Sequence, residues 1–520
     1  MDLNLILLNY LKVAKYNKEK LINKKIAVVG GGIGGICVAS LLAHKGFMVD
    51  LFEQNEYLGG KAGEIKINNF RFDTGPSILT LLENLEEFFD LCGEDMNEYL
   101  TIYPLRILSR NFFEDRKIIN IYSDPNLTAE ELCKKANVKK SRFFRYLKNI
   151  KFLSNLFLNF YSKGLFSKTS NLTDLRFVLR VIFNLVKIPL FTKFIQYLNK
   201  FFGQNYYIER IFGRFVTYVG SDPYQSSAIL HIIADAELNK GGFYVEGGIY
   251  SIVKAIQNIG EKNGVNFYLN SKVLKVLDEN ESKVLKVSKK VNQFLEEHEY
   301  KYDIVISNLD YVLTNTKLLN QKVTPILEDQ KHLSSSVIVF LIGIEGITKE
   351  MDIHNVFFSD DYKKEFDEIF NKQTIPTDPT VYVNITSKYC SEDAPNGNEN
   401  WFTLVNVPPK TKLNNREINS LLNKIILKIE KFIPNIKSRI LFFEVLDPQF
   451  YEIQTGSYMG SLYGLNTNYF KHFFLRPGNR DKKIKGLYYV GGSVSPGGGI
   501  PNVVRSAINC YKEIISDYKI

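Results

Sequence analysis

The sequence predicts an α/β protein built on a Rossmann-type dinucleotide-binding domain. Near the start, a short apolar strand at residues 26–29 runs straight into a glycine-rich turn. A helical pattern at 36–46 and a second apolar strand at 49–53 complete a β-loop-α-β unit. Near the end, residues 486–514 again have a glycine-rich strand-turn-helix pattern. Because an α/β pattern also appears at 242–310, we expect this domain to be assembled from distant segments.

Two kinds of segment alternate along the chain and predict discontinuous domains. We expect the dinucleotide-binding domain to comprise residues 25–89, 238–310 and 451–520, where strands, glycine turns and helices alternate. Residues 90–237 carry aromatic and apolar side chains at helical spacing with basic residues between them, which predicts a helical region. Residues 311–450 mix strand and helix patterns, which predicts a mixed α+β substrate domain.

The composition is that of a well-packed protein with an excess of positive charge. Of the 520 residues, 45% are hydrophobic and 13% aromatic, so the chain can bury a large core. The formal net charge of +10 suits an anionic partner such as nucleic acid, a membrane surface or an acidic ligand. No nucleic-acid motif is present, and the basic residues lie among aromatics rather than in a block, so we expect no nucleic-acid partner.

Cysteine and histidine usage argues against disulfides and metals. The five cysteines are scattered and odd in number, which predicts reduced thiols in a cytoplasmic protein. The six histidines are dispersed without an H-E-x-x-H, and no C-x-x-C occurs, so we expect no metal site.

The ends of the chain carry no recognisable membrane span. Residues 1–24 form an extension that could be an amphipathic helix, but Asp2 and the lack of a cleavage site make it a poor signal peptide. The longest uncharged window, 486–504, is broken by Pro496 and successive glycines. It is therefore no spanning helix.

Gly30, Gly32 and Gly35 form a G-x-G-x-x-G motif between the first strand and the first helix. The first glycine permits the tight turn, the second lets a pyrophosphate approach the backbone, and the third lets helix and strand pack closely. The helix N-terminus then offers free N–H groups to the anion. Alone the motif has a purely structural alternative, but here it lies between a strand and a helix.

Glu53, at the end of the second strand, strengthens the dinucleotide interpretation. A carboxylate there can accept hydrogen bonds from ribose hydroxyls and would repel a 2′-phosphate. Gly59 and Gly60 follow, where the backbone could pass close to the dinucleotide, and Lys61 could pair with a phosphate. In isolation the paired glycines could equally be an ordinary turn.

Short motifs follow one another in a fixed order along the chain. They are VVGGGIGG, GGKAG, FRFDTGPS, FVTYVGSDPYQSSA, GGFYVEGG, IVISNLD, HNVFFSDDY, GSLYG, RPGN and GLYYVGGSVSPGGGIPNVV. In this pattern the chain resembles the phytoene desaturase (carotenoid desaturase) family of FAD enzymes, within the amine-oxidase-like flavoproteins. The resemblance covers nearly all of the chain from residue 25 onward, and its C-terminal run is the most specific part.

The resemblance implies FAD as cofactor, with the C-terminal glycine run closing the site. Gly497 and Gly498 would lie near the flavin with their neighbours. The cofactor-binding residues that we predict are Gly30, Gly32, Ile33, Gly34, Gly35, Glu53, Gly60, Lys61, Val273, Gly491, Gly492, Gly499 and Ile500.

Three positions depart from the family pattern. Lys61 stands where the family commonly has arginine, which keeps the charge but loses bidentate geometry. Phe243-Tyr244-Val245 replaces a tryptophan-tyrosine-proline run. Ser495 replaces the histidine that usually precedes the proline of the last motif, which puts in doubt a necessary catalytic role for that histidine.

The basic-aromatic helices within residues 141–218 have two interpretations. One is core packing with a solvated basic face. The other is a hydrophobic tunnel with a membrane-facing surface, whose composition is that of interfacial helices. Since the substrates implied by the resemblance partition into lipid, we favour a peripheral membrane partner.

The resemblance implies dehydrogenation of a long apolar carotenoid, in which a C–C single bond beside a conjugated run becomes a double bond at the flavin. The motif GGSVxPGGGIP resembles that of desaturases that act on hydroxylated or methoxylated carotenoid ends. No residue is identified as a general base, so we name none as catalytic, and we assign no oligomeric state. Carotenoid isomerases and retinoid saturases of the same family are alternatives. A flavin amine oxidase, or a non-catalytic FAD- or lipid-binding protein, is an alternative of another class, although 491–499 lacks a cysteine for a flavin link.

Overall fold

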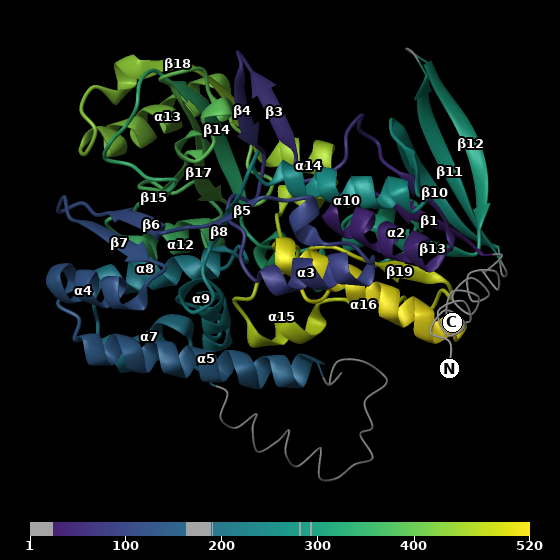
Figure 1. Cartoon of the computed structure of the whole chain (residues 1–520), viewed down its shortest axis with the longest axis horizontal. Helices are drawn as coiled ribbons and strands as arrows, with labels where there is room; N and C mark the ends of the chain where they lie inside the picture. Colours follow the sequence, from purple (N-terminus) through teal and green to yellow (C-terminus); the bar gives the residue numbers. More distant parts are fainter. Residues whose placement is uncertain (1–23, 163–188, 190, 280–281, 292–293) are drawn as a thin grey trace, which may run out of the picture.

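The computed structural model describes residues 24–162, 189, 191–279, 282–291 and 294–520 (Figure 1). Two sheets organise it: a five-stranded sheet towards the right of Figure 1 and a seven-stranded sheet towards the left. Each sheet is assembled from strands that lie far apart in the sequence.

The five-stranded sheet is parallel throughout, with the order β9-β2-β1-β13-β19. Its strands are β1 (Lys25–Val29), β2 (Met48–Phe52), β9 (Asn266–Tyr268), β13 (Ile304–Ser307) and β19 (Leu487–Tyr489). β2 and β9 lie on one side of β1, and β13 and β19 lie on the other, so the strand order reverses at β1. Open α/β sheets bind ligands at the carboxyl ends of the strands where the strand order reverses in this way. The β-loop-α-β unit predicted from the first strand onward is confirmed.

Both faces of this sheet are covered. Ile26 and Val28 point towards a layer of helices, whereas Ala27 and Val29 point towards a three-stranded antiparallel sheet. The helices are α2 (Ile33–Lys45), α3 (Leu82–Leu91), α10 (Tyr250–Lys262) and α16 (Ile500–Tyr518), and the strands are β10 (Ser271–Glu279), β11 (Ser282–Val291) and β12 (Phe294–Tyr302). Burial on both faces explains why β1 is a continuous apolar run.

The seven-stranded sheet is mixed and has the order β18-β14-β17-β16-β15-β6-β7. Its strands are β6 (Ile107–Phe112), β7 (Ile118–Tyr122), β14 (Ser336–Ile344), β15 (His354–Phe357), β16 (Val381–Asn384), β17 (Glu399–Val407) and β18 (Ile440–Leu446). On one face Ile338 and Phe340 pack against α13 (Asn415–Glu430). Val337 on the opposite face points towards the middle of the molecule, where it lines a cavity together with Leu404.

The region expected to be helical at 90–237 is only partly so. Residues 102–122 form the strands β5 (Ile102–Pro104), β6 and β7 instead. β6 pairs with β15, and β5 pairs with β8 (Phe243–Val245), so partners distant in sequence decide the conformation. The helices that follow are α4 (Pro125–Ala136), α5 (Lys140–Ser162), α7 (Phe194–Phe202), α8 (Tyr206–Thr217) and α9 (His231–Leu238).

These helices share one core with α12 (Tyr362–Phe370) and lie below the seven-stranded sheet in Figure 1. Short elements connect the two halves of the molecule. They are the hairpin β3 (Glu64–Ile67) and β4 (Phe70–Asp73), and the helices α11 (Tyr311–Leu313), α14 (Pro448–Thr455) and α15 (Phe470–Leu475).

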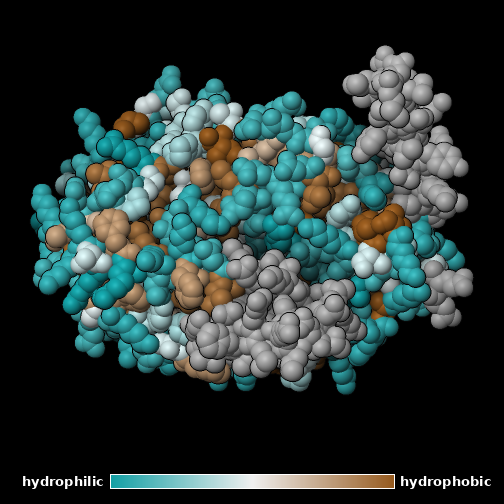
Figure 2. All heavy atoms as spheres, turned by 60° about the horizontal axis from the view of Figure 1, so that its bottom comes forward, coloured by the Kyte–Doolittle hydropathy of each residue, from teal (hydrophilic) through white to brown (hydrophobic). Residues whose placement is uncertain are grey.

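α5 is an amphipathic helix on the outside of the molecule. Tyr146 and Ile150 are buried, whereas Lys148, Lys151 and Phe152 are exposed. Figure 2 shows the face that carries this helix, where hydrophobic groups are interspersed among hydrophilic ones. Among the described residues, no helix is both long and apolar enough to cross a membrane.

Two expectations concern residues that the structure does not describe. The N-terminal extension at 1–24 lies, apart from Lys24, outside the described residues. So does the central part of the basic-aromatic region within 141–218. The amphipathic extension therefore stays a prediction. For the membrane-facing surface, α5 is the described helix that bears on the expectation.

Candidate functional site

A cavity of about 860 Å³ lies between the two sheets and is lined by residues of both. On one side are the loops at the carboxyl ends of β1, β2 and β13 together with the C-terminal glycine run. On the other are side chains of the seven-stranded sheet and of α8 and α12. All the predicted cofactor-binding residues line this cavity except Gly35.

The glycine turn after β1 is packed around Asn308, at the end of β13. A Cβ on Gly32 would lie 2.7 Å from Asn308 Nδ2, and one on Gly34 would lie 2.7 Å from Asn308 Oδ1. A Cβ on Gly35 would collide with the carbonyl oxygen of Gly30, so Gly35 serves helix–strand packing rather than the cavity wall. Sequence reasoning missed Asn308, although it lies within the motif IVISNLD.

Glu53 holds the same turn from its other side. Its Oε2 accepts a hydrogen bond of 2.7 Å from the backbone N–H of Gly31, and its Oε1 accepts one of 2.9 Å from that of Asn55. Burial raises the pKa of this carboxyl, while the backbone hydrogen bonds oppose the rise. Glu53 therefore shapes the glycine turn and also faces the cavity.

Lys61 lines the cavity but is already engaged. Its Nζ donates a hydrogen bond of 2.6 Å to the backbone carbonyl of Leu462. Burial lowers the pKa of Lys61 to about 8, against the opposing charge of Asp310. The predicted pairing with a phosphate stays a prediction, since this ammonium already has a protein partner.

The C-terminal glycine run closes the cavity next to Asn308. Gly491 has a φ of +117°, and a Cβ there would lie 2.9 Å from Asn308 Oδ1. Arg476 fixes the run by donating hydrogen bonds of 2.8 Å each to the carbonyls of Gly492, Tyr463 and Leu465. Ser495 is not among the residues that line the cavity, and its N–H donates to the carbonyl of Pro477 at 2.8 Å.

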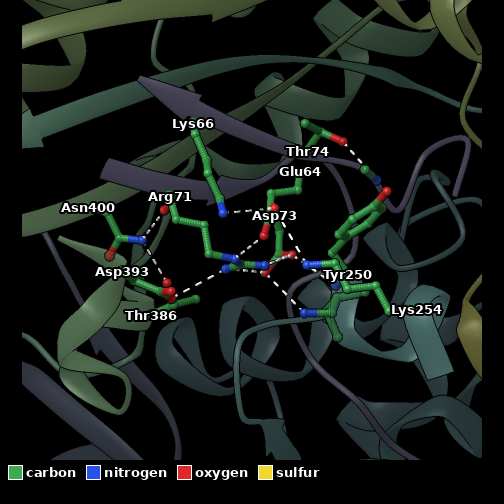
Figure 3. Close-up of polar contacts among 12 residues, drawn as sticks. Glu64, Lys66, Arg71, Asp73, Thr74, Tyr250, Lys254, Thr386, Asp393 and Asn400 are labelled. Carbon is green, nitrogen blue, oxygen red and sulfur yellow. Dashed lines mark hydrogen bonds and ion pairs between the residues drawn. The ribbon is translucent and has the colours of Figure 1, made fainter. Parts of the chain in front are cut away.

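A buried ionic cluster around Arg71 supports the loop that lines the cavity at Gly75 and Pro76 (Figure 3). Arg71 makes ion pairs of 2.6 Å with Glu64, 2.6 Å with Asp73 and 3.3 Å with Asp393. Asp73 also accepts hydrogen bonds from the first N–H groups of α10, so the cluster ties the β3–β4 hairpin to that helix. The cluster itself lies outside the cavity wall.

The remaining cavity wall is partly apolar and partly polar, since Glu365, Thr380 and Asn406 line it besides a further polar group of side chains. Its apolar members include Ile78, Leu108, Val337, Val356, Phe366, Phe402 and Leu404. Its polar group includes Ser77, Arg214, Tyr218, His354 and Tyr382, which come from separate elements. The described residues hold no group of three His, Cys, Asp or Glu side chains placed to bind a metal.

The fold and the glycine-lined cavity define a Rossmann-like dinucleotide-binding protein. Residues 28–94 match the family model of the NAD(P)-binding Rossmann-like domain. A solved putrescine oxidase variant has the same fold, with a TM-score of 0.62 at 12% identity, covering 95% of this chain and 99% of that one.

The curated relatives narrow the class. The 1-hydroxycarotenoid 3,4-desaturase of Flavobacterium sp. is 34% identical, covering 93% of this chain and 97% of its own length. The 4,4'-diapolycopene oxygenase of Methylomonas sp. is 29% identical, and the match covers 95% of this chain and 99% of that protein. The chain belongs to the carotenoid desaturase family, as the order of its motifs predicts.

Proposed function

We propose that this protein is an FAD-dependent carotenoid desaturase that introduces C=C bonds into a long apolar polyene, in particular one with a hydroxylated end. Membership of the family carries the proposal. The cavity supports it, because glycine loops suited to a dinucleotide and an apolar chamber belong to one continuous space.

The residues present fit FAD. At Gly32 and Gly34 any side chain would displace Asn308, so only glycines allow this turn, and both line the cavity where a pyrophosphate would lie. Glu53 offers its remaining lone pairs to ribose hydroxyls, with Val273 beside it on the cavity wall. Gly491 and the neighbouring C-terminal residues would lie against the flavin. We accordingly assign residues 25–89, 238–310 and 451–520 to the FAD-binding domain, 90–237 to a helical region and 311–450 to the substrate domain.

When bound, FAD would supply the acceptor for the hydride removed from one carbon of the polyene, while a proton leaves the adjacent carbon. The side chains of the protein would bind the polyene and orient it. Val337, Phe402 and Leu404 offer an apolar wall along which a polyene can lie, and they exclude water from the reacting carbons. A hydrocarbon chain offers few polar groups, so its position along the cavity has to be set by shape and by its end groups.

The outer face of α5 supports peripheral attachment to a membrane. Phe144 and Phe152 are exposed beside exposed lysines, the combination found in helices that lie in a bilayer interface. A cytoplasmic protein on an anionic surface could then take its substrate from the lipid. Flotation with anionic liposomes tests this attachment, which we expect at low salt and not at high salt. Indifference to liposomes at low salt would contradict it.

The cofactor is tested by releasing and chromatographing the flavin of the purified protein. We expect FAD, and we expect Gly32→Val to abolish its retention because the side chain would displace Asn308 and distort the glycine turn that faces the cavity. Gly478→Val is the matched control, since a Cβ there meets nothing within 4 Å. A normal flavin content in Gly32→Val would contradict the assignment.

The reaction is tested by co-expression in hosts that accumulate phytoene or a 1-hydroxylated acyclic carotenoid, followed by pigment chromatography and mass spectrometry. We expect a product that has lost two hydrogen atoms and absorbs at longer wavelength. An unchanged mass would instead indicate an isomerase, a gain of hydrogen a saturase, and a gain of oxygen an oxygenase.

A further inference from the structure

A polar cluster lies in the cavity wall on the side away from the Rossmann sheet. We define it as Arg214, Tyr218, His354 and Tyr382, which come from α8 and its C-terminal end, β15 and β16. Figure 1 shows α8 and β15 to the left of β1 and α2. Apolar residues such as Leu108 and Val356 line the same cavity, as do the polar residues Glu365 and Thr380.

His354 presents a hydrogen-bond donor without a partner. Burial lowers its pKa to about 3, so the ring is neutral at physiological pH. Its Nδ1 faces Asn384 Nδ2 at 3.2 Å, and that amide nitrogen also donates to the carbonyl of Ile353, so Nδ1 is the acceptor. The ring proton is therefore on Nε2. Nε2 is buried and has no hydrogen-bond partner among the described residues.

Arg214 presents a second such donor. Its guanidinium donates to Glu237 at 2.5 Å, to Ser109 at 3.2 Å and to Tyr218, but its Nε has no partner in the described part of the chain. The side chain is 8% exposed. Because the charge of Glu237 offsets that of Arg214, the pair offers N–H groups without a net charge.

Buried N–H groups normally have an acceptor, so these two donors indicate a ligand atom that accepts. The atom would be an oxygen of an uncharged group, since the arginine–glutamate pair is neutral overall. A protonated amine has no lone pair and could not accept a hydrogen bond from either donor. This chemistry favours an oxygen-bearing end of an apolar chain over a polar amine substrate.

The cluster adjoins the proposed cofactor site. Tyr382 OH lies 2.7 Å from His354 Nδ1 and 2.7 Å from Ser77 Oγ. Ser77 follows Gly75, where a Cβ would collide with the carbonyl oxygen of Lys61. A chain end held at the cluster would therefore keep the bonds nearest that end close to the glycine loops.

We propose that His354 Nε2 and Arg214 Nε form an end-group subsite that binds a hydroxyl, ether or carbonyl oxygen at one terminus of the polyene. The proposal rests on the proposed function, and it makes the two side chains specificity-determining residues for that reaction.

His231 is a matched control for His354. It is also buried, its pKa is also lowered to about 3 by burial, and its Nδ1 also faces a tyrosine hydroxyl, that of Tyr146 at 2.9 Å. Its Nε2, in contrast, has a partner in the carbonyl of Phe194 at 3.2 Å, and it does not line the cavity. Replacing either ring with phenylalanine removes a buried imidazole, but only one replacement removes the free donor.

The experiment measures binding rather than turnover. FAD-loaded protein in detergent is titrated with a 1-hydroxylated acyclic carotenoid and with the parent hydrocarbon of the same length. Binding is followed by quenching of Trp401, the only tryptophan, which is buried on β17. We expect the hydroxylated polyene to bind about tenfold tighter to the wild type, the scale of one hydrogen bond.

The variants decide whether the subsite causes this preference. We expect His354→Phe to reduce it to less than about twofold, His354→Gln to retain part of it through its amide N–H, and His231→Phe to leave it unchanged. If His354→Phe does not fold, His354→Gln and the wild type still test the proposal. Equal binding of both polyenes to the wild type, or an intact preference in His354→Phe, would overturn the subsite. No binding of either polyene would overturn the proposed function itself.

Discussion

Arg71 and Arg214 are both buried, yet their surroundings differ. Arg71 pairs with Glu64, Asp73 and Asp393, and each of its three guanidinium nitrogens donates to at least one of these carboxylates. It lies outside the cavity wall. Arg214 has one carboxylate partner, Glu237, lines the cavity, and has an Nε without a partner in the described chain.

The two arginines do not differ in charge state. Burial alone would lower the pKa of each, but the neighbouring carboxylates outweigh it, and both pKa values are raised. They differ in whether their hydrogen bonds are saturated. A saturated cluster such as that of Arg71 can only hold elements together, whereas an unsaturated one in a cavity wall is completed by a ligand.

The largest effect is expected from Arg71→Met, which leaves the buried carboxylates of Asp73 and Asp393 without their cation. We expect a loss of about 3–5 kcal/mol of stability, or failure to accumulate folded protein. Thermal unfolding of the purified variant measures it. Lys66→Met is the control, since Lys66 is 69% exposed at 3.6 Å from Glu64 and should change stability by no more than about 0.5 kcal/mol. A stable Arg71→Met would show that the cluster does not hold the hairpin.

Arg214 separates stability from recognition. Arg214→Met should lower the free energy of unfolding by about 3 kcal/mol, because it leaves the fully buried carboxylate of Glu237 without its cation. Arg214→Met combined with Glu237→Gln should recover most of that stability and still bind hydroxylated and unhydroxylated polyenes more equally than the wild type does. Unfolding temperature and the ratio of the two dissociation constants are measured on the same samples. A double variant that kept the wild-type ratio would show that Arg214 is purely structural.

Acidic pH should affect stability and leave recognition unchanged. The pKa of His354 and that of His231 are each lowered to about 3 in the folded state, well below the value of about 6.5 in an unfolded chain. Their contribution to stability is complete above about pH 6.5 and is lost as the pH falls towards 3, because only the unfolded chain takes up the protons. Relative to His231→Phe, the wild type should lose stability below pH 6.5, a comparison that cancels the opposite effect of Glu365, whose pKa burial raises to about 7. The polyene preference should stay constant from pH 5.5 to 8. A preference that follows a titration near pH 6.5, and still does so in Glu365→Gln, would contradict a neutral His354.

The smallest effect is expected at Ser495, which belongs to neither cluster and does not line the cavity. Ser495→Ala should retain FAD and lose less than about tenfold in activity, roughly one kcal/mol of barrier. A loss beyond a thousandfold with FAD still bound would show that this hydroxyl takes part in the chemistry.

Local patterns predicted the parts of the molecule that are local in the chain. The strand, glycine turn and helix from Lys25 to Lys45 follow from spacing alone, because their contacts lie within one β-loop-α-β unit. The strands at 102–122 could not be found in this way, since β6 takes its parallel partner from β15, more than two hundred residues away. Both arginine clusters were missed for the same reason. Arg71 meets Asp393, and His354 meets Ser77 through Tyr382, only after folding.

The most direct measurement is an experimental structure of the FAD-loaded protein with a bound 1-hydroxylated polyene. We expect the hydroxyl oxygen to lie at about 2.7–3.2 Å from His354 Nε2 or Arg214 Nε, with the polyene running along Phe402 and Leu404 towards the glycine loops. We also expect the hydrogen bonds around Arg71 to be unchanged. A hydroxyl bound elsewhere, with both donors still unpartnered, would contradict it.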